Sequence, residues 1–188
     1  MKNKNERKFY LREYRTISRA ISTYESMNLL FQHLVEGVCR TFGFKGGSVL
    51  LYDDKEKELF RINSYGLSDE YLDKGSIYIN DDLDTFLKGD IALYINLEND
   101  KRVKYADAAK KEGIVAMISL PIKCKNSIIG LLKCYNSEEI LIHEDDIESI
   151  KVLLQQLGLR IEINGMKNFI DTIKAAMDNL PPYIIEGL

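Results

Sequence analysis

The spacing of apolar residues changes along the chain from a helical period to a strand period and back, and this change limits the possible folds most narrowly. Between residues 8 and 42, apolar side chains recur every three or four positions, as on one face of an α-helix. From Gly46 the period changes to two, which is typical of β-strands, although the stretch Leu67–Asn96 is mixed. Residues 144–169 return to the helical period. Helices before and after a run of antiparallel strands predict an α+β fold.

The amino-terminal part of the chain is expected to form two helices. The first spans residues 8–24, and the second begins at Ser26, which can cap it, and ends at Phe42 before Gly43. Residues 1–25 precede the main domain, so the first helix has little sheet left to cover. We therefore expect its apolar stripe to pair with a second copy of the chain. The residues of this stripe, at alternating spacings of four and three, are Tyr10, Tyr14, Ile17, Ile21 and Tyr24.

The middle of the chain alternates between strands and polar turns. Asp53–Lys57 is a charged turn that closes a hairpin, and the pair Lys125-Asn126 closes a second one. Pro121 lies inside a strand, so that strand is irregular or lies at a sheet edge there. A helical turn is expected at Asp84–Lys88 and a short helix at Tyr105–Glu112. The predicted strands are Ser48–Tyr52, Leu59–Tyr65, Ser76–Asn80, Ile91–Ile95, Ile114–Lys123 and Ser127–Asn136.

The carboxyl-terminal part is expected to form the longest helix, over residues 144–169. Acidic residues in its first turn favour that start, because the positive end of the helix dipole lies there. Gly158 and Gly165 each weaken a helix by about 1 kcal/mol relative to Ala. A further helical piece, Phe169–Leu180, is stopped by Pro181-Pro182. A second apolar stripe, which we expect to join the first in a homodimeric bundle, consists of Ile147, Ile150, Leu154, Leu157 and Ile161.

Charge and composition exclude several classes of protein. Lys plus Arg number 26 and Asp plus Glu 29, a net charge of −3, which argues against general nucleic-acid binding. The longest apolar run, Ile114–Ile122, is too short to span a bilayer, and no secretory signal follows the charged amino terminus. The three cysteines form no C-x-x-C pair, so neither a disulfide framework nor a zinc site is expected. A cytoplasmic protein is predicted.

Several sequence blocks resemble the GAF domain, the small-ligand sensing module of signalling proteins, over residues 26–165. The opening blocks are G-G-S-V-L-L-Y-D and L-F-R-I-N-S-Y-G-L. The later blocks begin at Gly113 and read G-I-V-A-M-I-S-L-P-I, I-I-G-L-L-K-C-Y-N and H-E-D-D-I-E-S-I-K-V-L-L-Q-Q-L-G-L-R-I-E-I-N. The resemblance implies a PAS-like, six-stranded antiparallel sheet with the long terminal helices on one face. It also implies that residues 66–113, hereafter the lid segment, cover the other face. Residues 166–188, which lie outside the resemblance, are expected to form a helical extension.

No residue pattern in the chain points to catalysis or to a metal site. His33 and His143 have no partners at metal-ligand spacing, and no phosphate-binding glycine loop is present. Free methionine sulfoxide reductases, which resemble GAF domains, use cysteines in the lid segment, and this lid segment has none. The sequence signature of cyclic-nucleotide-binding GAF domains is not recognisable in this chain, although Asn96, Lys101 and Asp107 occur in the lid segment. The cysteine to which tetrapyrroles are attached in phytochrome-like domains has no counterpart in the lid segment either. We expect no catalytic residue and no metal, and the cofactor stays unassigned.

Polar and aromatic side chains among apolar neighbours around the lid segment are the candidates for binding a ligand. Lys133 is the most unusual of them, because it interrupts the apolar run 128–134. Alternation places Leu131, Lys133 and Tyr135 on one face of the strand. Lys133 would bind an anionic group if it pointed into a pocket, but we expect it to point outward into solvent. The candidates are Tyr65, Tyr78, Tyr94, Asn96, Tyr105, Met117, Ser119 and Lys133.

These observations predict a sensory or regulatory module of bacterial signal transduction that is not an enzyme. It would bind a small molecule or a signalling partner and transmit the change through its terminal helices as a homodimer. Two alternatives stay open. One is a dimerisation scaffold without a ligand, and the other is a redox enzyme of the free methionine sulfoxide reductase type.

Overall fold

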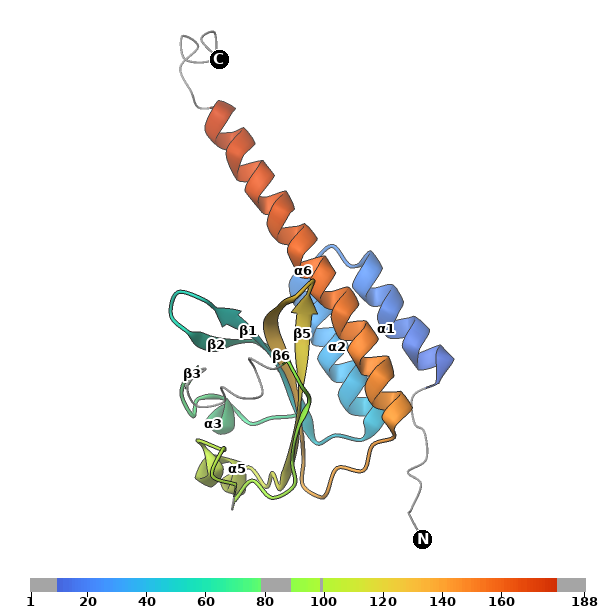
Figure 1. Cartoon of the computed structure of the whole chain (residues 1–188), viewed down its shortest axis with the longest axis vertical. Helices are drawn as coiled ribbons and strands as arrows, with labels where there is room; N and C mark the ends of the chain where they lie inside the picture. The colour runs from blue at the N-terminus through green and yellow to red at the C-terminus, as the bar shows by residue number, and fades with distance from the viewer. Residues whose placement is uncertain (1–9, 79–88, 99, 179–188) are drawn as a thin grey trace.

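The computed structural model describes residues 10–78, 89–98 and 100–178, and its elements follow the predicted order (Figure 1). The helices are Leu11–Thr23 (α1), Met27–Phe42 (α2), Asp69–Leu72 (α3), Ala106–Lys111 (α5) and Glu144–Asp178 (α6). The strands are Gly46–Asp53 (β1), Glu58–Tyr65 (β2), Ile77–Tyr78 (β3), Ala92–Tyr94 (β4), Ala116–Cys124 (β5) and Ser127–Asn136 (β6). The α+β class predicted from the apolar periods is confirmed.

The strands form one antiparallel six-stranded sheet in the order β3-β2-β1-β6-β5-β4. The predicted hairpins are present as β1–β2 and β5–β6. Strand β6 pairs with both β1 and β5, which places Lys133 opposite Ser48 on one side and opposite Ser119 on the other. Among the described strands, β4 pairs with β5 only at Met117–Ser119. Pro121 lies beyond this paired stretch, so its lack of a backbone N–H loses no hydrogen bond to β4.

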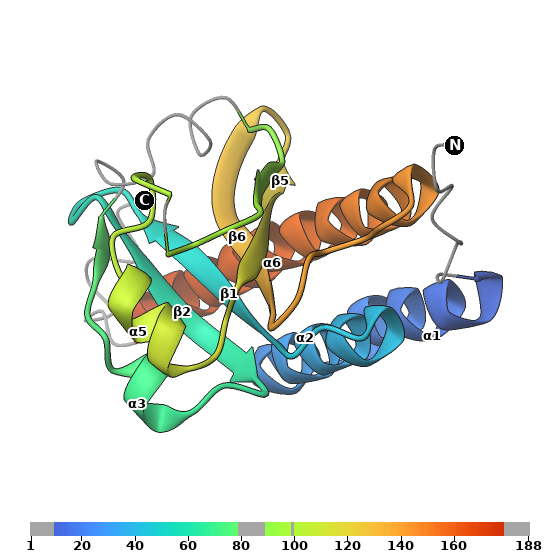
Figure 2. The same cartoon turned by 90° about the horizontal axis from the view of Figure 1, so that it is seen from below.

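Two long helices cover one face of the sheet, hereafter the helical face (Figure 2). Helix α2 packs on β1 and β2, and α6 packs on β5. Alternate residues of β5 and β6, such as Ile118 and Leu132, point into this layer and meet Leu34 of α2 and Leu154 of α6 in one apolar core. Burial of each such large side chain stabilises the fold by about 1.5–3 kcal/mol. The helical face is therefore the main source of stability.

Helix α1 packs against α2 and α6 of its own chain. Ile17 and Ile21 are only 7% and 2% exposed. The Ser18 hydroxyl donates to Gln156 Oε1 of α6 at 3.0 Å, and Arg160 of α6 donates to a carbonyl at the end of α1 at 2.8 Å. The prediction that this stripe lacks an intramolecular partner is wrong, because the apolar surface of α2 and α6 extends outward and α1 covers it.

Helix α6 is a single element of 35 residues, so the predicted division into two pieces near Phe169 is wrong. The described part of this helix contains no proline, and the first one follows at Pro181. Gly158 has a packing role: a Cβ atom there would lie 2.1 Å from the carbonyl oxygen of Lys123. The glycine thus lets α6 lie directly against the backbone of β5, which offsets its poor helix propensity.

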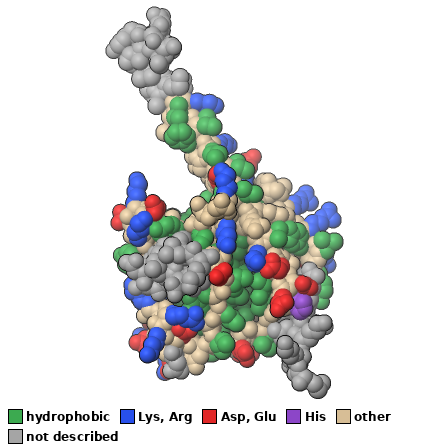
Figure 3. Space-filling model, viewed as in Figure 1, with side chains coloured by type: hydrophobic (Ala, Val, Ile, Leu, Met, Phe, Trp, Pro, Cys, Tyr) green, Lys and Arg blue, Asp and Glu red, His purple; other side chains and the backbone are tan. Residues whose placement is uncertain are grey.

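The far part of α6 projects away from the domain, and hydrophobic side chains follow it (Figures 1 and 3). Every residue from Gly165 to Ala175 is exposed. The predicted stripe of α6 faces its own sheet instead, since Ile150, Leu154 and Leu157 are buried. A different set of exposed apolar residues, hereafter the outer stripe, recurs at coiled-coil spacing: Val152, Leu159, Ile163, Met166, Ile170 and Ile173.

The lid segment lies on the other face of the sheet, hereafter the lid face (Figure 2). It contributes α3, β3, β4 and α5, and the short helix predicted at Tyr105–Glu112 is confirmed as α5. The strand predicted at Ser76–Asn80 is present as β3, although residues 79 and 80 are not described. The helical turn predicted at Asp84–Lys88 lies outside the described residues. The sheet with terminal helices on one face, which the GAF resemblance implied, is confirmed.

Candidate ligand-binding site

A cavity, hereafter the lid cavity, lies between the lid segment and the lid face of β5 and β6. Its volume of about 50 Å³ is room for about four water molecules. A larger outer cleft of about 380 Å³ shares with it Tyr71, Lys74, Lys104 and Tyr105. The lid cavity is lined by Tyr71, Lys74, Ile77, Tyr94, Leu97, Arg102, Val103, Lys104, Tyr105, Met117, Lys133 and Tyr135.

Strands β5 and β6 contribute Met117, Lys133 and Tyr135 to the cavity wall. Lys133 is 5% exposed, so the prediction that it points into solvent is wrong. Alternation along β6 places it on the same face as Leu131 and Tyr135, as predicted, and the lid segment covers that face. The sequence pattern gave the face correctly, but whether the lid segment covers it depends on contacts distant in sequence.

Tyr71 of α3 stands against the sheet side of the cavity. Its ring meets the Tyr135 ring edge-on with centroids 5.7 Å apart, and the Tyr135 hydroxyl shares a hydrogen bond of 3.3 Å with Ser48. Burial, followed by the proximity of Tyr135, raises the pKa of Tyr71 far above its ordinary value. The Tyr71 phenol is therefore a neutral hydrogen-bonding group at physiological pH and does not serve as a general base.

Lys74 lies over the face of the Tyr71 ring, with its Nζ 3.6 Å from the ring centroid, and donates to the Tyr71 carbonyl at 3.1 Å. Its pKa is lowered from 10.5 to about 8, first by burial and then by repulsion from Lys133 and Arg61. Glu112 acts in the opposite direction but does not reverse the shift. The lowered pKa indicates that two lysines share one poorly solvated space.

The mouth of the cavity is formed by residues that follow β4. Arg102 lies over the Tyr94 ring at 4.4 Å, and its Nε donates to Asp100 at 2.9 Å. Lys104 lies between two tyrosines, at 5.1 Å from the ring of Tyr78 and 5.5 Å from that of Tyr105. The Tyr105 hydroxyl donates to the Ser76 carbonyl at 2.7 Å, which ties the α5 region to the β3 region.

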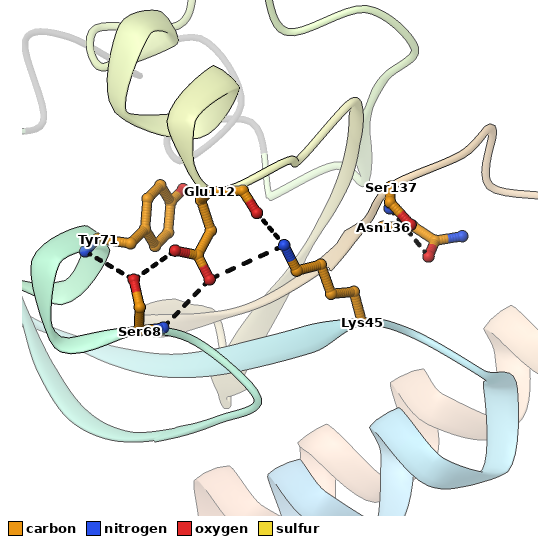
Figure 4. A network of polar contacts seen from close by, with 6 residues as sticks. All are labelled: Lys45, Ser68, Tyr71, Glu112, Asn136 and Ser137. Carbon is orange, nitrogen blue, oxygen red and sulfur yellow. Dashed lines mark hydrogen bonds and ion pairs between the residues drawn. The ribbon is translucent and has the colours of Figure 1, made fainter.

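Glu112 joins the parts of the lid segment to the rest of the domain (Figure 4). Its carboxylate accepts hydrogen bonds from the backbone N–H of Ser68, at 3.1 Å, and from the Ser68 hydroxyl. Lys45, just before β1, donates to the Glu112 carbonyl, and its Nζ is 3.9 Å from the carboxylate. Burial opposes ionisation of Glu112, but the Ser68 hydrogen bonds and the charges of Lys45 and Lys74 together lower its pKa. The carboxylate is therefore ionised and held by these groups.

The lid cavity brings together half of the ligand-binding residues predicted from the sequence. Tyr94, Tyr105, Met117 and Lys133 line it. Their roles toward a ligand remain predictions, but their common location was expected.

The other four predicted residues lie outside the cavity lining. Tyr65 packs on the helical face, where its hydroxyl accepts from Arg40 at 3.2 Å. Tyr78 and Asn96 are exposed, although Tyr78 contacts Lys104 at the cavity mouth. Ser119 is fully buried on the lid-face side of β5, and its hydroxyl has no hydrogen-bond partner among the described residues. Local pattern does not determine which residues converge on one cavity, and the roles of these four toward a ligand stay predictions.

Sequence reasoning missed several lining residues: Tyr71, Lys74, Arg102, Lys104 and Tyr135. Tyr135 was placed on the correct face by strand alternation and could have been included. Lys74, Arg102 and Lys104 stand in polar stretches, where lysine and arginine ordinarily face solvent. Only the folding of these stretches over the sheet makes them part of a cavity.

The histidines and cysteines take structural places in the fold. His143 accepts a hydrogen bond from the backbone N–H of Asp145 at 3.1 Å, as expected for a residue at a helix start. His33 lies 2.6 Å from the Tyr24 hydroxyl. Cys39 and Cys134 are fully buried in the core of the helical face. Within the part of the chain that the structure describes, no group of His, Cys, Asp and Glu side chains is arranged to hold a metal ion.

The sequence profile of the GAF domain family matches residues 26–161, and the chain belongs to this family. No curated protein sequence matches it significantly. Over residues 10–78, 89–98 and 100–178, none of the helices is long and apolar enough to span a membrane.

Solved structures with the same fold include several GAF domains. The GAF domain of a phosphoenolpyruvate-protein phosphotransferase from Coxiella burnetii is 16% identical, with a TM-score of 0.75, over 84% of this chain and 95% of that one. Its counterpart from Acinetobacter is 18% identical, with a TM-score of 0.70, over 83% and 94%. The chromophore-binding domain of a bacteriophytochrome from R. palustris is 14% identical, with a TM-score of 0.66, over 81% and 61%. At these identities the similarity establishes the fold.

Proposed function

We propose that the chain is a regulatory module, not an enzyme, which binds a small molecule in the lid cavity and signals through α6. The observation that carries the proposal is the cavity itself, in which tyrosine rings and a methionine surround a few cationic groups. Small-molecule sites are typically concave, largely apolar and equipped with a few polar groups that orient the ligand. One similar structure is described as a chromophore-binding domain, so this fold holds a small molecule in that protein.

The strands under the cavity provide a physical route from the ligand to α6. Lys133 and Tyr135 line the cavity from β6, and the opposite face of the β5–β6 hairpin carries α6. At the tip of this hairpin the Cys124 thiol and Lys125 Nζ both donate to Glu162 of α6, each at 2.8 Å. A displacement of the hairpin by a ligand would therefore move the helix at the point where it leaves the domain.

Signalling through α6 is proposed to require a second copy of the chain, paired in parallel along the outer stripe. The stripe is apolar and exposed over several turns, which a monomer in water disfavours. Its three-four spacing matches the a and d positions of a coiled coil, while the residues that face the sheet occupy other positions.

Sedimentation velocity of the full chain at micromolar concentration tests the pairing. The wild type is expected to be a dimer, and Ile163→Asp or Ile170→Asp to be a monomer, because a buried unpaired carboxylate in the seam is costly. Ile95→Asp is the matched control, since Ile95 is 58% exposed and lies outside the outer stripe. A wild type that sediments as a monomer throughout would overturn the dimer.

Ligand binding is tested by thermal denaturation with the low-molecular-weight extract of the organism that makes the protein, together with native mass spectrometry. A ligand that binds only the folded state stabilises it by about 2.7 kcal/mol at a hundred times its Kd. Val103→Trp, which fills the cavity, should abolish the increase in Tm. Val115→Trp is the matched control, because Val115 is exposed and outside the lining. An increase that survives in Val103→Trp would contradict binding in the lid cavity.

The state of the thiols supports the proposal that the chain is not a redox enzyme. A hydrogen bond between the Cys134 and Cys39 thiols, together with burial, raises the pKa of Cys134. The hydrogen bond to Glu162 raises the pKa of Cys124. Nucleophilic cysteines need the thiolate, and raised pKa values disfavour it. A turnover assay with free methionine sulfoxide and a thiol reductant should therefore give no activity above the buffer rate.

A further inference from the structure

Two serines flank Lys133 in the sheet, and their hydroxyl groups differ in hydrogen bonding. Ser48 of β1 lies opposite Lys133 on one side, and Ser119 of β5 lies opposite it on the other. Both serines are buried, at 4% and 0% exposed. The Ser48 hydroxyl shares a hydrogen bond of 3.3 Å with the Tyr135 hydroxyl, whereas the Ser119 hydroxyl has no partner anywhere in the described ranges of the chain. The missing partner distinguishes two serines that are otherwise placed alike.

The unpaired hydroxyl of Ser119 destabilises the folded protein. A buried hydroxyl that gives up its hydrogen bonds to water without gaining a partner costs free energy. Nearly all buried polar groups in folded proteins are hydrogen-bonded, so an exception requires an explanation. Alanine at this position would fill almost the same space and would leave no polar group unsatisfied. The packing of the fold therefore gives no reason for a serine at residue 119.

Ser119 lies next to the lid cavity. Ile118 and Leu120 point into the core of the helical face, so alternation places Ser119 on the lid face together with Met117. Lys133 is directly opposite Ser119 on β6, and the Cβ atoms of such paired residues lie about 4.5–5.5 Å apart. Both Met117 and Lys133 line the cavity. The Ser119 hydroxyl is thus adjacent to two residues of the cavity wall.

The two wall residues beside Ser119 have flexible side chains. Methionine is unbranched and adapts its shape readily, and the ammonium group of lysine is carried on a flexible four-carbon stem. The cavity volume of about 50 Å³ is smaller than the roughly 300 Å³ or more of typical small-molecule sites, so a ligand that enters it displaces part of the wall. Rotation of Met117 or Lys133 would extend the cavity to Ser119.

We propose that Ser119 determines specificity for the ligand, because its hydroxyl forms a hydrogen bond only when a small molecule fills the lid cavity. This inference rests on the proposed ligand-binding function. The ligand then carries an oxygen or nitrogen atom at its most deeply buried end. A molecule with only hydrocarbon there would leave the hydroxyl unpaired, and sites built to hydrogen-bond a ligand reject analogues that lack the polar group.

Ser119→Ala tests the proposal through two changes that a structural role would not produce. Without extract, the Tm of the variant should lie about 2–4 °C above that of the wild type, because the substitution removes an unsatisfied polar group. With the low-molecular-weight extract, the variant should need about fivefold more extract than the wild type for the same increase in Tm, the factor that one neutral hydrogen bond contributes. A serine with a structural role alone would give a lower Tm and an unchanged response to the extract.

Two other serines provide matched controls. Ser48→Ala removes a hydroxyl that has a partner, so the Tm of this variant without extract should fall below that of the wild type. Ser127 is exposed at the start of β6 and lies outside the cavity lining. Ser127→Ala should therefore leave both the Tm and the response to the extract unchanged.

The possible outcomes separate this inference from the proposed function. An equal response of Ser119→Ala and the wild type to the extract would overturn the role of Ser119 and leave ligand binding intact. A lower Tm of Ser119→Ala without extract would also overturn it, because the hydroxyl would then have a partner in the protein alone. No response of the wild type to the extract would remove both proposals.

Discussion

The two faces of the sheet are made by the same strands but differ in what they bury. On the helical face β5 and β6 contribute Ile118, Leu120 and Leu132 to a continuous apolar core. On the lid face the neighbouring positions are Ser119 and Lys133, both buried. A dry, fully apolar layer maximises stability, whereas buried polar groups cost free energy unless they have partners. The difference indicates that the helical face holds the fold, and it supports the proposal that the lid face binds a ligand.

The largest expected effect comes from placing a charge on the helical face. Ile21→Asp should lower the free energy of unfolding by about 4 kcal/mol or more, because it leaves a carboxylate among the apolar side chains of α2 and α6. Urea denaturation followed by circular dichroism measures this. A loss of dimerisation with unchanged stability would instead show that α1 packs on a second copy in solution.

The second effect concerns the contact between α6 and the sheet. Gly158→Ala should destabilise by about 2–3 kcal/mol, because its Cβ meets the Lys123 carbonyl oxygen. Gly165→Ala is the control, since no atom lies within 4 Å of a Cβ at that position. That variant should stabilise the protein by about 1 kcal/mol through helix propensity alone. Equal effects of the two substitutions on the urea midpoint would contradict the close approach of α6 to β5.

A smaller effect is expected from the cysteines. Replacing Cys39, Cys124 and Cys134 together by Ala should lower stability by about 1–2 kcal/mol through lost packing, and leave ligand binding unchanged. The Tm shift with extract, measured on the triple variant after its new baseline is established, checks this. If a methionine sulfoxide reductase activity is present in the wild type and vanishes in the variant, the thiols are catalytic after all.

The last effect is the pH dependence that Lys74 contributes on the lid face. Its pKa is about 8 in the folded protein and 10.5 ordinarily, so the unfolded chain binds more protons between these values. Stability therefore rises with pH from about 8 to 10.5, as the penalty for a charged Lys74 near Lys133 and Arg61 is relieved. Lys74→Met should be more stable than the wild type at pH 7, with the difference decreasing toward pH 10. A constant difference in urea denaturation would show that Lys74 is not perturbed.

Apolar periodicity alone was sufficient for the secondary structure of most of the chain. The long helices α1 and α2, the first part of α6 and both hairpins are found where the period of three to four or of two predicted them, because the pattern records which face of each element is buried. The pattern did not say against what each face is buried. Ile17 and Ile21 formed a seam that suits a second copy as well as helices of the same chain, and the structure places them against α2 and α6.

Periodicity failed in the lid segment, where no element is long enough to repeat. The eight candidate residues were chosen by type, and only Tyr94, Tyr105, Met117 and Lys133 converge on one cavity. Lys74, Arg102 and Lys104 carry no local signal, since a lysine or arginine in a polar stretch is solvated unless a distant segment covers it. The tertiary fold alone brings these residues, which are far apart in the sequence, to one cavity.

The sequence by itself determined the family, the order of elements and the face on which each strand residue lies, because those follow from local spacing and from recognisable blocks of residues. The tertiary structure decided three other features: the burial of Lys133 under the lid segment, the continuity and outer stripe of α6, and the packing of α1 on its own chain. Each of these features depends on which apolar or polar surfaces pack together in the folded chain. Those surfaces come from segments far apart in the sequence, so the local residue pattern does not show which of them will meet.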